Sequence, residues 1–238
     1  MGSIFDIKFM VSTVPEIIAY LPITLLMAIV SCSIGFALAL GIALIRYFKV
    51  RGLDAAAKLF ISFIRGTPMI VQLYLSYYGL PVLLQGINES LGTNLNINAV
   101  PRLVFAFFAF SLNSAAYMSE TIRSAMLAVD VGQLEACYSV DMTTGQALRS
   151  VILPQAFATA LPPLGNSFIS LVKETSLAFS ISVVDMMAEA KIVGSRSFRF
   201  FEIYIVVSVI YWVICIAIER VVAAVERRLR RYDRERSA

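Results

Sequence analysis

Polar side chains recur at helical spacing inside two long apolar segments of this sequence. Ionisable and amide groups in such surroundings are costly to bury and mark a ligand or ion path by default. A zwitterion carries a carboxylate and an ammonium group that each need a partner, so two facing polar stripes can bind one. The candidate substrate pathway comprises Asn113, Tyr117, Asn166, Ser170, Lys173 and Glu174.

The same residues also fit a structural role. Asn and Ser commonly join membrane helices by hydrogen bonds, so Asn113 and Asn166 fit cavity lining and interhelical bonding equally. Lys173 and Glu174 can pair with charges on other helices. Both interpretations stay open at this point.

Arg65 and Glu120 are assigned to a structural ion pair rather than to the pathway. The sequence holds no histidine, and its three cysteines (Cys32, Cys137, Cys215) lie far apart, so it predicts neither a metal site nor a disulfide. An intramembrane enzyme would need a nucleophile with a base or a metal, and no such arrangement is visible. We therefore predict no catalytic residue.

The elements that position these side chains are membrane helices. Hydrophobic residues make up 59% of the chain and charged residues 15%, with a mean hydropathy of +0.79. Soluble domains carry about 25% charged residues, so polar surface is too scarce here to cover a water-soluble globule. Long apolar runs must satisfy their backbone internally, which favours helices over strands. The predicted fold class is an all-α integral membrane protein.

Five transmembrane helices are predicted. Residues 1–21 form an external segment, residues 22–222 the transmembrane domain, and residues 223–238 a basic cytoplasmic tail. The second span is interrupted at Thr67-Pro68 and the fourth is broken at Pro162-Pro163. A polar loop at 84–98 follows the second span. The five spans cover residues 22–45, 59–84, 104–127, 154 to beyond 179, and 204–222.

Lys and Arg set the predicted orientation. They concentrate after the first span, between the third and fourth spans, and in the tail, which are therefore the cytoplasmic side. This places the N-terminus outside and the C-terminus in the cytoplasm of a bacterial cytoplasmic membrane. For the basic tail we predict contact with anionic membrane lipid and not with nucleic acid.

A polar segment, residues 130–153, separates the third and fourth spans. Residues 133–140 can form two helical turns, and Thr143 with Gln146 has the form of a capping box that starts a second helix. Pro154 is expected to allow a sharp change of direction into the fourth span. Two short helices across the end of a bundle suit docking into a groove on another protein.

This segment resembles the EAA motif of the permeases of bacterial ABC importers. Glu135 and Ala136 match the start of that motif, and Leu153 and Pro154 match its end at the same spacing. The stretches "FIRGTPMIVQLYLSYYGLP" and "LNSAAYMSETIRSAMLAVDVGQLEA" resemble the polar amino acid subgroup, as does "LPQAFATALPPLGNSFISLVKETSLA". Within this subgroup the chain looks most like the cystine permeases.

The resemblance implies that two permease chains, identical or sisters, form one pathway. A pair of cytoplasmic ATPases would dock on the coupling segments and use ATP and Mg, while an external binding protein delivers the amino acid. This chain has no phosphate-binding loop and would bind no cofactor itself. The residues assigned to ATPase coupling are Gly132, Glu135, Ala136, Asp141, Gly145, Leu153 and Pro154.

The motif departs from the family pattern at Asp141, where the family has glycine, and also at Cys137 and Val151. Asp can adopt a left-handed turn, but at a cost that glycine avoids. Cystine is the first substrate expected, with glutamine, arginine or histidine as alternatives. A secondary transporter that needs no ATPase is a more distant alternative; it would show internal repeats and paired broken helices.

Overall fold

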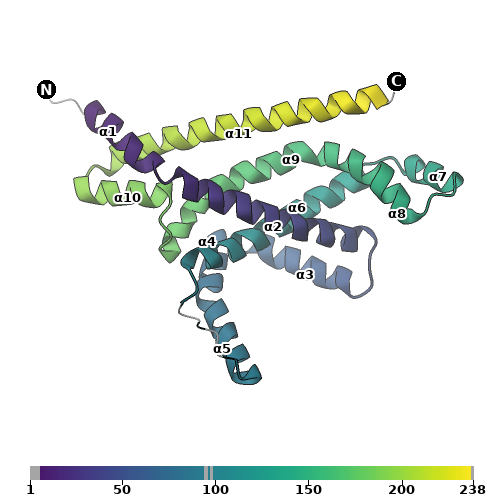
Figure 1. Ribbon diagram of the computed structural model, residues 1–238, viewed down its shortest axis with the longest axis horizontal. Helices are drawn as coiled ribbons and strands as arrows, with labels where there is room; N and C mark the ends of the chain where they lie inside the picture. Colours follow the sequence, from purple (N-terminus) through teal and green to yellow (C-terminus); the bar gives the residue numbers. More distant parts are fainter. Residues whose placement is uncertain (1–5, 94–95, 97–98, 237–238) are drawn as a thin grey trace.

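Helices make up the secondary structure of this chain. The computed structural model describes residues 6–93, 96 and 99–236, with side chains described as far as residue 228, and no strand occurs in those ranges. The elements (Figure 1) are α1 (Ile7–Ile18), α2 (Leu21–Tyr47), α3 (Leu53–Gly66), α4 (Met69–Tyr74), the π-helix η1 (Leu75–Gly79), α5 (Leu80–Leu91), α6 (Arg102–Leu127), α7 (Val131–Ser139), α8 (Thr144–Ala147), the π-helix η3 (Leu148–Ile152), α9 (Leu153–Glu174), the 3-10 helix η4 (Thr175–Ile181), α10 (Met186–Ser197) and α11 (Phe200–Arg236).

Three helical stretches within the described residues are long and apolar enough to cross a membrane, and a bent pair adds a fourth. The three are Leu21–Tyr47, Met69–Leu91 and Phe200–Arg228; the pair joins Thr144–Ile181 to Met186–Ser197 at 55°. Five spans were predicted, and three or four of them are found by length and composition. Helix α6, at the predicted third span, is long enough, because its 26 residues reach about 39 Å at 1.5 Å per residue, but it is not among the apolar stretches. Its sequence contains more polar residues, and the side chains of Ser111, Asn113, Ser114 and Ser119 are buried inside the bundle.

Helix α6 lies at the centre of the bundle, and its most extensive contacts are with α2. The two backbones approach closely at Gly35, where an added Cβ would lie 2.6 Å from the Cβ of Ser114 and 3.0 Å from the carbonyl oxygen of Ser111. Small residues at such crossings let membrane helices pack tightly. This contact fixes one wall of the region that carries the polar stripe of α6.

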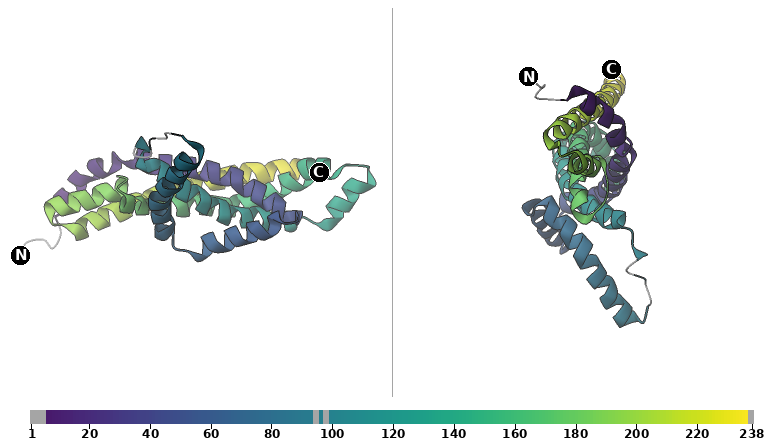
Figure 2. Two further views of the ribbon diagram at one scale, coloured as in Figure 1. Left: turned by 90° about the horizontal axis from the view of Figure 1, so that it is seen from below. Right: turned by 90° about the vertical axis from the view of Figure 1, so that its left-hand side faces the viewer.

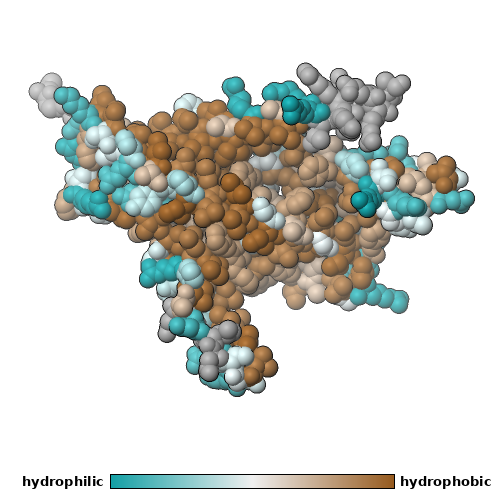
Figure 3. Space-filling model, viewed as in Figure 1, coloured by the Kyte–Doolittle hydropathy of each residue, from teal (hydrophilic) through white to brown (hydrophobic). Residues whose placement is uncertain are grey.

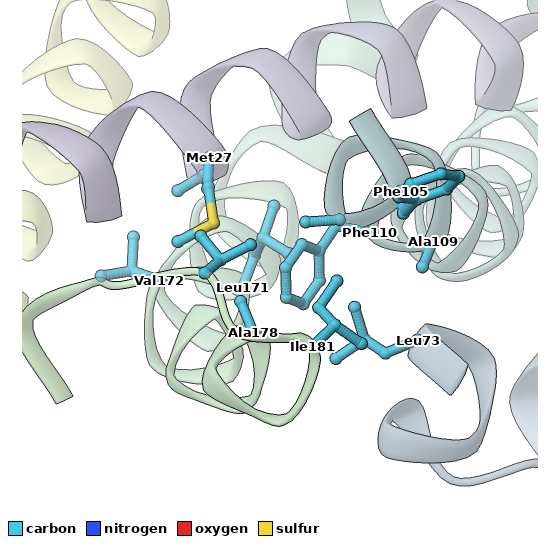
Figure 4. Packing of buried hydrophobic residues seen from close by; sticks show 12 residues of the cluster. Met27, Leu73, Phe105, Ala109, Phe110, Leu171, Val172, Ala178 and Ile181 are labelled. Atoms are coloured by element: carbon cyan, nitrogen blue, oxygen red, sulfur yellow. The ribbon is translucent and has the colours of Figure 1, made fainter. Parts of the chain in front are cut away.

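An apolar cluster packs α6 against its neighbours on the N-terminal side of the Gly35–Ser114 contact. Phe110 is fully buried, and Met27 and Leu73 approach it from α2 and α4 (Figure 4). Leu171 from α9 and Ile181 from η4 complete the cluster. The core therefore joins α2, α4 and α6 to the continuous stretch of α9 and η4.

Helix α5 projects from the bundle as an arm (Figures 1 and 2). None of its residues is buried, and Val82, Leu83 and Leu91 are among its exposed apolar side chains. The predicted second span at 59–84 is wrong in its limits: α3 ends before Thr67-Pro68, because a proline cannot continue the hydrogen-bond ladder, and the span starts at Met69. Half of the predicted loop at 84–98 is helix, and residues 94–95 and 97–98 lie outside the described part of the chain.

The predicted break at Pro162-Pro163 is also wrong, because both prolines lie inside the continuous helix α9. Membrane helices tolerate such prolines, although each lacks the N–H that would bond the carbonyl oxygen four residues earlier, here those of Ala158 and Thr159. The break comes later, at Ser182, whose φ of 61° is left-handed. Asp185 then caps α10 by accepting from the backbone N–H of Ala188.

The termini lie at opposite ends of the long axis, and the surface between them is largely hydrophobic (Figures 1 and 3). At the N-terminal end, ion pairs join Glu16 to Arg196 and Asp6 to Arg199. The hydrogen bond from Arg199 holds the pKa of Asp6 below its usual value. At the other end, α11 continues to Arg236, so the predicted boundary at residues 222 and 223 falls inside one helix.

Candidate functional site

The coupling segment forms two short helices, as predicted, at the end of the bundle where α11 ends (Figure 1). Asp130 caps α7 by accepting from the backbone N–H of Gly132 at 2.8 Å. The expected capping box is present at α8: the Thr143 hydroxyl accepts from the N–H of Gln146, and the Gln146 side chain accepts from the N–H of Thr143. Local polar spacing alone thus sets both helix starts.

The turn between these helices centres on Asp141, whose φ is 56°. The N–H of Met142 bonds the carbonyl oxygen of Cys137, and the N–H of Asp141 bonds that of Tyr138. This pair of bonds is the Schellman motif, which places a left-handed residue after the helix and favours glycine there. The aspartate therefore occupies a position that prefers glycine, as the resemblance to the EAA motif implied.

The coupling residues divide into an exposed set and a set at the bundle. Glu135 and Ala136 are exposed on α7, while Cys137 is buried and anchors the helix. The exposed set also includes Gly132, Asp141 and Gly145. Leu153 and Pro154 lie at the start of α9 and line an apolar cavity of about 330 Å³ with Phe36, Arg149 and Phe157.

Pro154 does not produce the expected change of direction. The chain runs as one helical stretch from Thr144 to Ile181, through the π-helix η3, and Pro154 lies in the first turn of α9. The wider π-helical turn directly before it, in which the N–H of Leu153 bonds the carbonyl oxygen of Leu148, carries the helix past the proline without a break. The reversal occurs instead in the turn at residues 140–143.

A polar cavity of about 290 Å³ lies between α6 and α9. It brings together five of the six predicted pathway residues: Asn113, Tyr117, Asn166, Ser170 and Glu174, with Ser114, Ser167 and Leu171. Asn166 and Ser170 are exposed on the surface of this single chain, and Tyr117 is 44% exposed. The cavity is therefore open on one side.

Lys173 is the sixth predicted pathway residue, and it is exposed outside this cavity. It follows Ser170 by three residues and precedes Glu174 by one, so its side chain leaves the helix in a different direction from that of Glu174. Helical spacing placed Lys173 and Glu174 on the same face, but only Glu174 lines the cavity.

A second polar cavity, of about 550 Å³, adjoins the first and shares Tyr117 and Ser167 with it. Its other lining residues include Ser124 on α6 and Thr159 on α9, which lie nearer to the coupling segment along both helices. The two cavities together are lined by polar side chains along α6 and α9. Arg65 and Glu120 also line this second cavity.

The predicted ion pair between Arg65 and Glu120 is wrong. Glu120 pairs with Arg46 of α2 and with Arg123 one turn further along α6. The Arg65 guanidinium lies over the ring of Tyr117, 5.3 Å from its centroid, in a cation–π contact. Arg65 therefore stands at the junction of the two cavities, and its charge is not neutralised by Glu120.

Gln72 and Asp185 are among the buried polar residues that were not predicted from the sequence. Gln72 of α4 is 6% exposed and hydrogen-bonds Asn113 in the cavity wall. Asp185 is fully buried at the break before α10, where Tyr211 of α11 donates to it at 3.4 Å. Gln72 follows the "RGTP" stretch and Asp185 stands alone between apolar residues, so both carried a signal, but neither lies on a polar stripe.

These features define a class of protein: a membrane-embedded transport subunit, with a polar path along the bundle and a helix pair exposed at its end. Comparison with known proteins then gives the family. Residues 34–231 match the model of the "Binding-protein-dependent transport system inner membrane component" family. The chain belongs to this family, so it is a multi-pass component of the inner membrane.

Relatives narrow the class further. The chain is 45% identical over 211 residues to the "Probable amino-acid permease protein YxeN" of Bacillus subtilis, covering 89% of this chain and 90% of that protein. It is 37% identical to the "L-cystine transport system permease protein TcyL" of the same organism, covering 97% and 94%. The crystal structure of "an amino acid ABC transporter with histidines" is 36% identical, with a TM-score of 0.79, covering 94% and 99%. This chain is an amino-acid ABC transporter permease subunit.

Proposed function

We propose that this permease imports a polar amino acid, with cystine as the first candidate, along the polar path between α6 and α9. The observation that carries the proposal is that two neighbouring polar cavities share Tyr117 and Ser167 as lining residues on an otherwise apolar surface. The "L-cystine" in the name of TcyL supports cystine, and the solved transporter "with histidines" supports histidine as a rival. Glutamine and arginine remain further alternatives.

The open side of the cavity supports a dimer. Asn166 and Ser170 are exposed in one chain. Polar side chains exposed inside a membrane find no hydrogen-bond partner in the lipid tails, so they favour a protein surface or a ligand. A second permease chain, identical or a sister, would close the path. Helix α5 exposes Val82, Leu83 and Leu91, and this apolar arm fits packing in the same membrane.

The exposed helix pair supports docking of an ABC ATPase dimer, which would hydrolyse ATP with Mg, so this chain would be no enzyme and would bind no cofactor. An extracytoplasmic binding protein would deliver the substrate. Helix α11 ends toward the same end of the bundle as the coupling helices (Figure 1), and its Arg227 and Arg228 lie toward that end. Basic residues favour the cytoplasmic side, which supports an external N-terminus and a cytoplasmic C-terminus.

The test is reconstitution in proteoliposomes with the partner ATPase and the binding protein. Uptake of radiolabelled L-cystine would be compared with that of glutamine, arginine and histidine, with and without ATP. ATP-dependent uptake with cystine preferred is the expected result. Uptake that persists without ATPase or ATP would favour a secondary transporter, and preference for another amino acid would replace cystine.

A further inference from the structure

The break between α3 and α4 leaves two carbonyl oxygens without the usual backbone N–H donor four residues later. The oxygen of Ile64 would normally accept from the N–H four residues later, but that residue is Pro68, which has none. The amide nitrogen of Gln72 donates to this oxygen at 2.7 Å instead. The Thr67 hydroxyl similarly donates to the carbonyl oxygen of Phe63 at 3.0 Å.

These bonds fix which end of the Gln72 amide points where. Its nitrogen also lies 3.0 Å from the carbonyl oxygen of Thr67 and 3.0 Å from the Thr67 hydroxyl oxygen. Carbonyl oxygens only accept, and the Thr67 hydroxyl already donates to Phe63, so only an N–H₂ group fits in this position. The Gln72 oxygen must therefore point away from the break, toward α6.

The Gln72 oxygen in turn orients Asn113. The Nδ2 of Asn113 donates to it at 3.0 Å, and the two side chains are only 6% and 8% exposed. A flipped Asn113 would place its oxygen against the oxygen of Gln72, which is unfavourable in a buried setting. The Oδ1 of Asn113 is thus the amide atom left for the polar cavity, whose lining also includes the carboxylate of Glu174.

We propose that Gln72 is a positioning residue that holds the Asn113 oxygen toward the cavity, so that the cavity selects a ligand group that donates hydrogen bonds, namely the α-ammonium group of an amino acid. The proposal rests on the proposed function of this cavity as the substrate path. Gln72 does not touch the ligand; it acts through Asn113. The Gln72 nitrogen bonds the carbonyl oxygens at the break between α3 and α4, so the geometry of this break sets the orientation of the Asn113 amide.

Binding to the purified permease–ATPase complex, without the binding protein, provides the test. Isothermal titration calorimetry would use L-cystine, L-glutamine, L-arginine and L-histidine, each beside its Nα-acetylated derivative, which lacks the ammonium group. Gln72→Met keeps the length of the side chain but lets the Asn113 amide rotate. We expect the preference for the free amino acid to fall by at least about tenfold, the effect of one hydrogen bond to a charged group.

Gln85→Met is the matched control, because it makes the same substitution on α5, outside the cavity, where the exposed Gln85 amide donates to Glu89 of its own helix. It should keep the wild-type preference. A double-mutant cycle with Asn113→Ala separates positioning from packing: if Gln72 acts through Asn113, adding Gln72→Met to Asn113→Ala should change the preference no further.

The outcomes separate this inference from the proposed function. If the wild-type complex binds the amino acids and folded Gln72→Met keeps the full preference, the positioning role is wrong while the pathway stands. If the wild-type complex binds none of the four, the cavity is not the substrate site and both fall. If Gln72→Met does not fold, Asn113→Ala alone decides, because an unchanged preference in that variant overturns the role of the Asn113 oxygen.

Discussion

The coupling helices and the polar cavity place their polar groups in opposite ways. Helix α7 exposes Glu135 and Ala136. The hydrogen bonds that hold α7 and α8 join residues at most six positions apart. The cavity gathers side chains from α6 and α9, and its wall depends on Gln72, 41 residues from Asn113. A surface built from local bonds and left without contacts suits a partner protein, whereas a cavity built from distant elements suits a small ligand.

This difference separates two kinds of defect. Changes in the coupling helices should reduce transport without altering the affinity for the amino acid. Changes in the cavity should alter affinity while ATPase docking persists. A variant that crosses these categories would show that the two regions are not independent.

The largest effect is expected from Glu135→Ala. The carboxylate is exposed on α7 and supports nothing within its own helix, so its loss should remove ATPase docking and lower uptake by at least about 100-fold, while the chain stays folded and inserted. Co-purification with the ATPase and uptake in proteoliposomes measure both effects. Gln133→Ala, at another exposed position of the same helix, is the control and should retain both. Normal uptake by the Glu135 variant would contradict the proposed role of Glu135 in coupling to the ATPase.

The next effect concerns the close contact of α2 with α6. Gly35→Ala places a methyl group 2.6 Å from the Cβ of Ser114, so we expect a loss of about 1–3 kcal/mol in the free energy of unfolding, with weaker amino acid binding because Ser114 lines the cavity. Thermal unfolding in detergent measures the first effect. Gly41→Ala is the matched control on the same helix, since nothing lies within 4 Å of its added Cβ. Equal stability of the two variants would contradict the close packing.

Asn166→Ala should have a smaller effect, confined to the ligand. Asn166 lines the cavity and is exposed in the single chain, so its removal should raise the KM for uptake by about tenfold and leave the amount of inserted protein unchanged. Ser33→Ala, which loses an exposed hydroxyl that bonds only to its own helix, is the control. An equal fall in uptake and in protein amount would favour a structural role for Asn166.

The sequence predicted what local spacing determines. The helix start at Thr143 and the left-handed cost at Asp141 follow from residues a few positions apart, whereas the cap at Asp130 lies three residues before the predicted start of the first coupling helix. The apolar runs likewise predicted the all-helical fold, because length and composition suffice to identify membrane helices. The stripes on α6 and α9 predicted most of the cavity, because each stripe is a periodic pattern on one helix.

The errors arose where the partner was remote in sequence. Glu120 has several arginines within reach in the fold, and only the packing of α2 on α6 brings Arg46 to it rather than Arg65. Gln72 lies off both stripes, so its bond to Asn113 appears only once α4 is packed on α6. The limits of the second span were wrong because a proline ends α3 without ending the apolar pattern.

The smallest effect is expected from Asp141→Gly. The φ of 56° at this position strains a side chain but not glycine, which also suits the Schellman motif that ends α7. The relief is of the order of 1 kcal/mol, so transport-coupled ATPase activity should stay the same or rise slightly. Asp141→Asn, which tolerates the left-handed region while removing the charge, separates strain from electrostatics. Loss of ATPase stimulation in both variants would show that the Asp141 carboxylate has a partner of its own on the docked ATPase.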